Sequence, residues 1–233
     1  MHRFGMIGFA GAMSVLISGI APAQAKRYPL DAAAGLRLHN VIAQPATLQG
    51  KKGVRVEVAP DVTDPLTEPL ARIDGLEFAN GVIEAEIAGV PAPGAGGGAR
   101  GFVGIAFRLQ DDMKTYDAFY LRPTNGRADD QERRNHATQY ISHPAWTWNR
   151  LRQETPSRYE SYVDLVPGEW TKIRIEVNGD KARLYVHDQH QPALIVNDVK
   201  SGATGKGGVA LWIGPGTIAH FRNVTVTARP LRE

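Results

Sequence analysis

The residues best suited to chemistry lie in one long polar segment, from about 123 to 156. Between Arg122 and Glu160 the chain holds seven arginines, no lysine and five carboxylates. Because a guanidinium group is a planar fork of donors, arginine without lysine favours bidentate contacts with a polar or acidic ligand. The ligand-binding side chains predicted in this segment are Asn125, Arg133, Arg134, Asn135, Gln139, Tyr140, Trp146 and Trp148. A structural hypothesis stands beside this one: the carboxylates at 129, 130, 132 and 154 pair with the arginines and hold the segment in place.

A second candidate group lies on the strand that leads into this segment. Alternation places Tyr116, Tyr120 and Arg122 on one face of a sheet, and the preceding strand adds Arg108 beside small residues at 104 and 106. Small residues leave room, aromatic rings offer a flat platform and arginines offer donors, as a sugar-binding groove requires. The alternative is a solvated sheet face on which tyrosine and arginine stack.

Two residues are candidates for acid–base catalysis. A glycosidic bond is hydrolysed by a proton donor and a base that both reach the same oxygen. Glu160 is the carboxylate predicted for the first role, and His136 is the side chain that would titrate near neutral pH.

Several other kinds of site are excluded or weakly indicated. The chain has no cysteine, so neither disulfides nor thiolate metal sites can form. His187 and His190 are three residues apart but follow a strand near a turn, so we predict no metal site there. The sequence has no P-loop ending and no Gly-x-Ser-x-Gly elbow. A net charge of +3 is too small to indicate a nucleic-acid partner.

The first 25 residues are predicted to be a secretory signal peptide. Arg3 gives the positive start, an apolar run from Ile7 to Ile20 follows, and Ala23-Gln24-Ala25 is a small-x-small cleavage box. We therefore expect cleavage after Ala25, a periplasmic or secreted location, and a mature chain, 26–233, that does not span a membrane. The oligomeric state stays open.

The elements that must position these residues are short strands. Ile173, Ile175 and Val177 alternate with polar residues, and Asn178-Gly179 then predicts a hairpin turn. Similar segments recur along the chain, separated by turn residues. We predict a single all-β domain, a two-sheet antiparallel sandwich of the jelly-roll kind, interrupted by the long loop at about 123–156.

The strand sequences also resemble a known group. The segments that carry the resemblance are 78–87 (FANGVIEAEI), 101–108 (GFVGIAFR), 116–123 (YDAFYLRP), 169–177 (EWTKIRIEV) and 182–186 (ARLYV). From about Leu76 to Val226 they are similar to the concanavalin A-like lectin/glucanase superfamily, in particular the laminin-G-like and 3-keto-disaccharide hydrolase type domains of exported bacterial proteins.

This resemblance implies a carbohydrate-handling sandwich, and it leaves three functions open. The chain could be a glycoside hydrolase of the 3-keto-disaccharide type, a module that binds a saccharide without cleaving it, or a laminin-G-like protein-interaction domain. No cofactor is predicted, although a structural calcium ion would fit the superfamily. Glu84-Ala-Glu86 lacks the Asp and the third carboxylate of the laminarinase motif, so glucanase chemistry of that kind is not expected.

Overall fold

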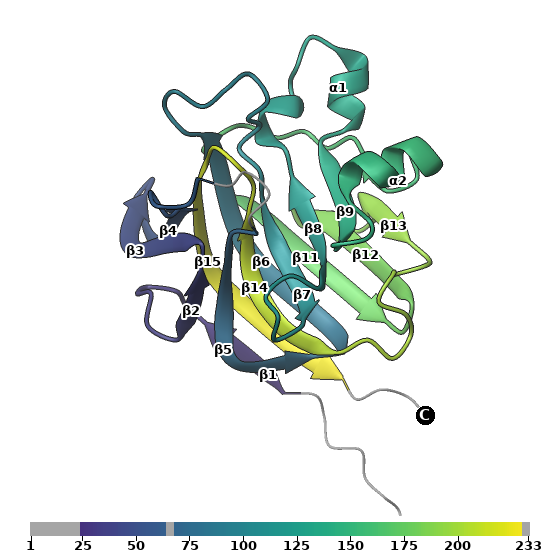
Figure 1. Cartoon of the computed structure of the whole chain (residues 1–233), viewed down its shortest axis with the longest axis horizontal. Coiled ribbons are helices and arrows are strands. Elements are labelled where there is room, and N and C mark those ends of the chain that lie inside the picture. The colour runs from purple at the N-terminus through teal and green to yellow at the C-terminus, as the bar shows by residue number, and fades with distance from the viewer. Residues whose placement is uncertain (1–23, 64–67, 230–233) are drawn as a thin grey trace, which may run out of the picture.

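The computed structural model describes residues 24–63 and 68–229 and shows two antiparallel sheets packed face to face (Figure 1). The predicted β-sandwich is confirmed. The predicted signal peptide lies outside the described residues, apart from its last two positions. The strands are β1 (Ala25–Tyr28), β2 (Leu36–His39), β3 (Val41–Leu48), β4 (Lys51–Val58), β5 (Leu70–Phe78), β6 (Asn80–Pro91), β7 (Val103–Leu109), β8 (Tyr116–Leu121), β9 (Thr138–His143), β10 (Glu160–Ser161), β11 (Thr171–Asn178), β12 (Lys181–Val186), β13 (Leu194–Val196), β14 (Gly207–Ile213) and β15 (Thr217–Arg229).

The strands follow one antiparallel order in each sheet. The eight-stranded sheet runs β13-β12-β11-β6-β15-β4-β3, and β1 pairs with the free half of β15. The seven-stranded sheet runs β10-β9-β8-β7-β14-β5-β2. Strands far apart in the sequence are therefore neighbours, as β7 and β14 are.

The core lies between the two sheets and follows the alternation of the sequence. Ile173, Ile175 and Val177 of β11 are buried while the residues between them are not, as predicted. The turn at Gly179, which has a positive φ of 60°, joins β11 to β12 as expected. From the other sheet, the ring of Phe107 stacks on Phe119 with centroids 6.1 Å apart. Apolar burial of this kind contributes about 25 cal/mol for each Å² removed from water.

The segment expected as a long loop is mostly ordered into short elements. It holds a 3-10 helix η1 (Pro123–Asn125), α1 (Gln131–Asn135), the strand β9 and α2 (Trp148–Glu154). None of these helices was predicted. Each helix has an N-cap: Asp130 accepts a hydrogen bond from the Arg133 backbone N–H, and Thr147 accepts one from that of Arg150. In Figure 1 both α-helices, α1 and α2, lie toward the end of the sandwich where β8 ends and β9 begins.

The sheet face predicted to be an open groove is covered. Tyr116 and Tyr120 of β8 are 1% and 2% exposed. The Trp212 ring from β14 stacks on Tyr120 with centroids 4.5 Å apart, and its Nε1 donates a hydrogen bond to the Tyr116 hydroxyl. Large side chains thus fill the space that the small residues of β7 leave, and the groove expected here is not present.

Arg108 also differs from the prediction. It has a positive φ of 56°, beside an irregularity in the pairing of β7 with β14, and its side chain is buried instead of facing a groove. Its guanidinium group donates to the carbonyl oxygens of Ala79, Gly179 and Gly202. Arg108 therefore ties three loops together at one end of the sandwich.

Candidate functional site

A cavity of about 780 Å³ opens at the end of the sandwich that carries the two helices. Its walls come from three parts of the chain: the Gly-rich loop and the residues after it at 95–102, the segment 122–152 and the turn at 215–216. Four arginines line it, at positions 100, 122, 133 and 152, and we call it the arginine cavity. A volume of this size is typical of small-molecule sites.

Arg122 lies at the base of the cavity, and both of its terminal nitrogens have partners within the protein. Its side chain is only 6% exposed. Nη2 donates to the Tyr120 hydroxyl and to the Gln139 Oε1, each at 2.9 Å, and Nη1 donates to the backbone oxygen of His136 at 2.9 Å. Arg122 therefore supports the cavity and contributes charge, while its hydrogen bonds go to the protein.

The other three arginines keep unused donors. Arg133 donates through Nε to Asn125 and through Nη2 to Thr124. Arg152 donates through Nε and Nη2 to Glu160, and Arg100 donates through Nη1 to backbone oxygens of its own loop. Among the described residues, no partner takes the Nη1 of Arg133 or Arg152, or the Nε and Nη2 of Arg100. These groups are available to a ligand that accepts hydrogen bonds.

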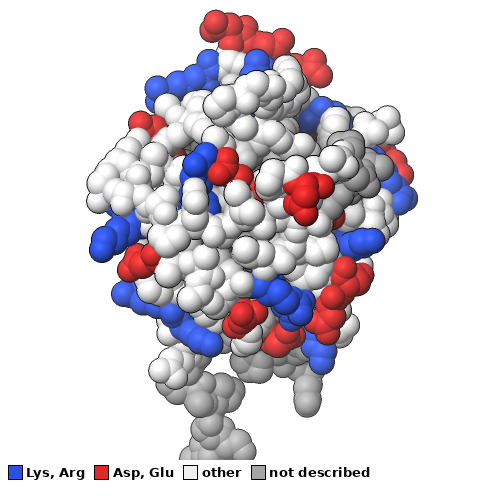
Figure 2. Space-filling model, turned by 60° about the vertical axis from the view of Figure 1, so that its left-hand side comes forward, with Lys and Arg blue, Asp and Glu red and all other residues white. Residues whose placement is uncertain are grey.

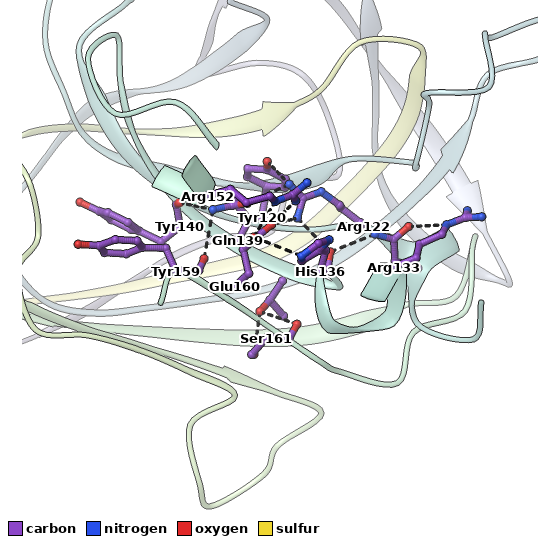
Figure 3. Close-up of polar contacts among 12 residues, drawn as sticks. Tyr120, Arg122, Arg133, His136, Gln139, Tyr140, Arg152, Tyr159, Glu160 and Ser161 are labelled. Atoms are coloured by element: carbon purple, nitrogen blue, oxygen red, sulfur yellow. Dashed lines mark hydrogen bonds and ion pairs between the residues drawn. The ribbon is translucent and has the colours of Figure 1, made fainter. Parts of the chain in front are cut away.

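Glu160 lies behind the arginines, with a side chain that is 2% exposed (Figure 3). One carboxylate oxygen accepts from Arg122 Nη1 at 3.2 Å and from Arg152 Nη2. The other accepts from Arg152 Nε at 2.9 Å and lies 3.6 Å from the Nε2 of His136. Both oxygens are engaged and Glu160 does not line the cavity, so the geometry fits a residue that holds arginines in place better than a proton donor.

His136 lines the arginine cavity with a side chain that is 17% exposed. Burial lowers its pKa, and so do the positive charges of Arg152 and Arg122, against the opposing effect of Glu160. A histidine with a lowered pKa is neutral at neutral pH and can accept a proton.

Positive charge is concentrated inside the cavity and negative charge at its rim. Burial and the nearby guanidinium groups of Arg133 and Arg122 lower the pKa of Arg100, as expected where like charges gather. The acidic lining residues are exposed: Asp130 is the N-cap of α1, and Glu132 lies in its first turn. Figure 2 shows a group of acidic side chains at the top of the molecule and acidic and basic side chains interspersed over the face below it.

The structure brings together about half of the predicted site. Five predicted residues line the cavity: Arg122, Asn125, Arg133, His136 and Trp148. Three more support it from behind: Tyr120, Gln139 and Glu160.

The remaining five predicted residues lie elsewhere. Tyr140 is fully buried and donates a hydrogen bond to Asp117 at 2.6 Å, because it faces the core between the sheets. Tyr116 is buried and donates a hydrogen bond from its hydroxyl to the Glu68 carboxylate. Trp146 packs between Arg150 and Lys200, whose charged groups lie 3.9 and 4.5 Å from the ring centroid.

Two residues of α1 also lie away from the cavity. Arg134 donates to the Tyr162 hydroxyl at 2.8 Å, with its guanidinium carbon 4.9 Å from the centroid of that ring. Asn135 is exposed and accepts from Gln131 within the same helix.

Sequence reasoning did not single out Arg100, Phe102 or Arg152, which also line the cavity. Arg152 belongs to the segment that holds seven arginines and no lysine, so this excess of arginine over lysine was a signal for it. Arg100 and Phe102 follow a Gly-rich stretch that indicates only a flexible connection. Their role depends on a loop that lies beside the segment 122–152 in space, although the two are separated in the sequence.

The ion pairs predicted to hold the segment are present in part. Arg150 pairs with Glu154 at 2.7 Å one helical turn away. Arg127 and Arg158 pair with Asp164 and Asp198, which lie outside the segment. In the described ranges, no three His, Cys, Asp or Glu residues gather to hold a metal ion, and no helix is long and apolar enough to cross a membrane. The structural calcium ion remains a prediction.

The fold is similar to those of several solved proteins. A Bacillus subtilis protein of unknown function with a galectin-like fold aligns with a TM-score of 0.55 at 11% identity, covering 89% of this chain and 96% of its own. A β-1,3-1,4-glucanase (lichenase) derived from a mouse hindgut metagenome aligns at 0.51 and 12% identity, covering 88% and 99%. The carbohydrate binding module CBM66 from Bacillus subtilis aligns at 0.50 and 14% identity, covering 82% and 97%.

These similarities show a lectin/glucanase type of β-sandwich, and at such low identity they show the fold alone. No protein-family model matches the sequence, and a search of curated proteins finds no match.

Proposed function

We propose that this chain is an exported carbohydrate-handling protein that binds an acidic saccharide in the arginine cavity. One observation carries the proposal: three arginines that line one cavity of about 780 Å³, Arg100, Arg133 and Arg152, each keep guanidinium donors without a partner among the described residues. Carboxylate and sulfate groups are the acceptors that match such forks in charge and geometry. Neutral sugars would leave this concentration of positive charge unused.

Aromatic side chains in the same cavity supply the apolar surface that a sugar ring needs. Phe102 and Trp148 line it, and Trp148 is 46% exposed with the Arg152 guanidinium carbon 4.9 Å from its ring centroid. The printed descriptions of two structural neighbours, a carbohydrate binding module and a lichenase, support a saccharide as the ligand class. The predicted signal peptide supports the same proposal, since it would bring the protein to extracellular glycans.

The two finer hypotheses from the sequence receive less support. A hydrolase of the 3-keto-disaccharide type with Glu160 as proton donor would need that buried carboxylate to leave its two arginines. A laminin-G-like interaction domain would need a continuous exposed apolar patch. The large exposed apolar residues of the described part come from several separate elements: Leu38, Ile42, Trp148, Tyr162 and Ile195.

The proposal is tested by calorimetry with trimannuronate and with mannotriose, which differ only in their carboxylates. We expect trimannuronate to bind and to raise the melting temperature, and mannotriose to bind at least about tenfold more weakly, as loss of a charged hydrogen bond implies. Arg133→Ala should weaken trimannuronate binding by about 10- to 100-fold.

The neighbouring residue provides a matched control. Arg134→Ala removes the same kind of side chain from the same helix but outside the cavity, so trimannuronate binding should stay within about twofold of wild type. Equal binding of the two sugars, or equal losses in the two variants, would contradict the proposal.

A further inference from the structure

The arginine cavity holds one neutral base among its positive charges. The described residues that line it include four arginines, two rim carboxylates and His136. Arginines stay protonated in proteins and cannot take a proton from a ligand. Asp130 uses a carboxylate oxygen to cap α1, at 2.6 Å from the Arg133 backbone nitrogen. Glu132 is exposed, whereas the His136 side chain is 17% exposed, so His136 is the base best placed to accept a proton inside the cavity.

Arginines beside such a base favour one particular reaction of acidic sugars. When guanidinium groups neutralise the carboxylate of a uronic acid, the C–H bond on the adjacent carbon becomes more acidic, because the negative charge that develops on the carboxylate is stabilised. A neutral imidazole can then remove that proton. The glycosidic oxygen on the next ring carbon is positioned to leave as the charge collapses.

We propose that the arginine cavity catalyses β-elimination within a uronic-acid-containing saccharide, with His136 as the base; this rests on the proposed binding of acidic saccharides. His136 takes the proton from the carbon that bears the carboxylate. The electron pair of that C–H bond forms a carbon–carbon double bond to the next ring carbon, whose bond to the glycosidic oxygen breaks. The imidazolium returns the proton to this oxygen, so the step consumes no water, oxidant or reductant.

The use of a single residue for both proton transfers predicts which sugars react. Tyr120 is buried behind Arg122 and does not line the cavity, so His136 must both take the proton and return it. The proton and the leaving oxygen must then lie on the same face of the sugar ring. Chains of mannuronate or glucuronate that are linked through the oxygen on this next ring carbon meet this condition. Galacturonate chains carry the two groups on opposite faces.

Arg152 and Arg122 are positioned for this reaction by Glu160, which binds both guanidinium groups from behind the cavity (Figure 3). Glu160 also lies 3.6 Å from His136 Nε2, close enough to stabilise the imidazolium that forms during the step.

To test this inference, the mature protein is incubated separately with trimannuronate, triglucuronate and trigalacturonate. Elimination leaves a double bond conjugated to a carboxylate, which absorbs ultraviolet light, and products lighter by one water than those of hydrolysis. We expect such products from the first two sugars and none from trigalacturonate. His136→Gln should lower the rate by about 100-fold or more while trimannuronate binding changes little. Arg134→Ala should leave the rate unchanged.

The outcomes separate this inference from the proposed function. If trimannuronate binds but yields no unsaturated product, or yields hydrolysis products, elimination is overturned and the binding function stands. Full activity in His136→Gln would remove His136 as the base. If trimannuronate does not bind at all, the proposed function fails and the elimination fails with it. Because the one polar contact of the His136 side chain among the described residues is the 3.6 Å approach to Glu160, circular dichroism should show a folded His136→Gln variant.

Discussion

Two adjacent arginines on α1 have opposite roles at the residue scale. Arg133 faces the cavity and is held by Asn125 and Thr124, whereas Arg134 lies against Tyr162 on the outside. Successive residues on a helix point about 100° apart, so only one of the two can face inward. Because α1 is too short for a helical repeat to be visible in the sequence, both arginines were predicted to bind the ligand.

Glu160 shows how the surroundings of a residue decide its role. The sequence presents it as an available carboxylate, and the fold buries it against Arg122 and Arg152. Removing one partner of a buried ion pair leaves the other charges uncompensated, which costs about 3–5 kcal/mol. We therefore expect Glu160→Gln to lower the free energy of unfolding by about that amount, as measured by urea denaturation.

A carboxylate on α2 supplies the comparison for this prediction. Glu154 is half exposed and pairs with Arg150 one turn away. Glu154→Gln should change the free energy of unfolding by less than about 0.5 kcal/mol, because exposed pairs of this kind contribute little. If Glu160→Gln were as stable as wild type, the structural role of Glu160 would be refuted.

At the scale of elements, the strands could be predicted from the sequence and the walls of the cavity could not. Alternation in β11 and the turn at Gly179 depend on neighbouring residues, and both were predicted correctly. The helices η1, α1 and α2 have three, five and seven residues, too short for a helical repeat of apolar residues to become visible. Their positions depend on caps and on contacts with distant parts of the chain.

Gly126, which directly follows η1, makes one of these contacts. A Cβ atom at this position would lie 2.2 Å from the backbone nitrogen of Leu165, so the segment after η1 packs closely against residue 165. Asn125, the last residue of η1, donates to the His136 backbone and accepts from Arg133. Gly126→Ala should therefore destabilise the protein by about 1–3 kcal/mol and weaken trimannuronate binding through displacement of Asn125.

Gly97→Ala is the matched control for this steric effect. A Cβ atom at Gly97 meets nothing within 4 Å, and its φ does not require glycine. The free energy of unfolding of Gly97→Ala, measured by thermal unfolding, should lie within about 0.5 kcal/mol of the wild-type value, as for other surface substitutions. A stable Gly126→Ala variant that binds normally would show that close packing at Leu165 does not determine the position of η1.

At the scale of the whole molecule, the site is assembled at one end of the sandwich from segments far apart in the sequence. The Gly-rich loop at 95–100, the helices and the turn at 215–216 meet there because β6 and β7, β8 and β9, and β14 and β15 are connected at this end. The fold could be predicted from local alternation together with the family resemblance. The meeting of Arg100 with Arg133 could not, since nothing in the sequence near either residue indicates the other.

The N-terminal strand β1 leads to a prediction about export. β1 begins at Ala25, the residue after which cleavage is predicted, and Lys26, Arg27 and Tyr28 pair with β15 in register. Cleavage after Ala25 would leave these three residues paired and Lys26 as the new N-terminus. We therefore expect the protein recovered from the periplasm or the medium to begin at Lys26, with a melting temperature within a few degrees of the uncleaved form.

Intact-mass spectrometry of the exported fraction measures this N-terminus directly. Ala23→Asp and Ala25→Asp, which place a charge at the small positions of the cleavage box, should leave the precursor uncut, while Gln24→Ala should be processed normally. The residues of β1 that pair with β15 directly follow the cleavage box. Cleavage farther along the chain would therefore remove β1 and leave this part of β15 without its partner strand. An exported protein that begins well beyond Tyr28 would contradict both the predicted leader and the place of β1 in the mature sheet.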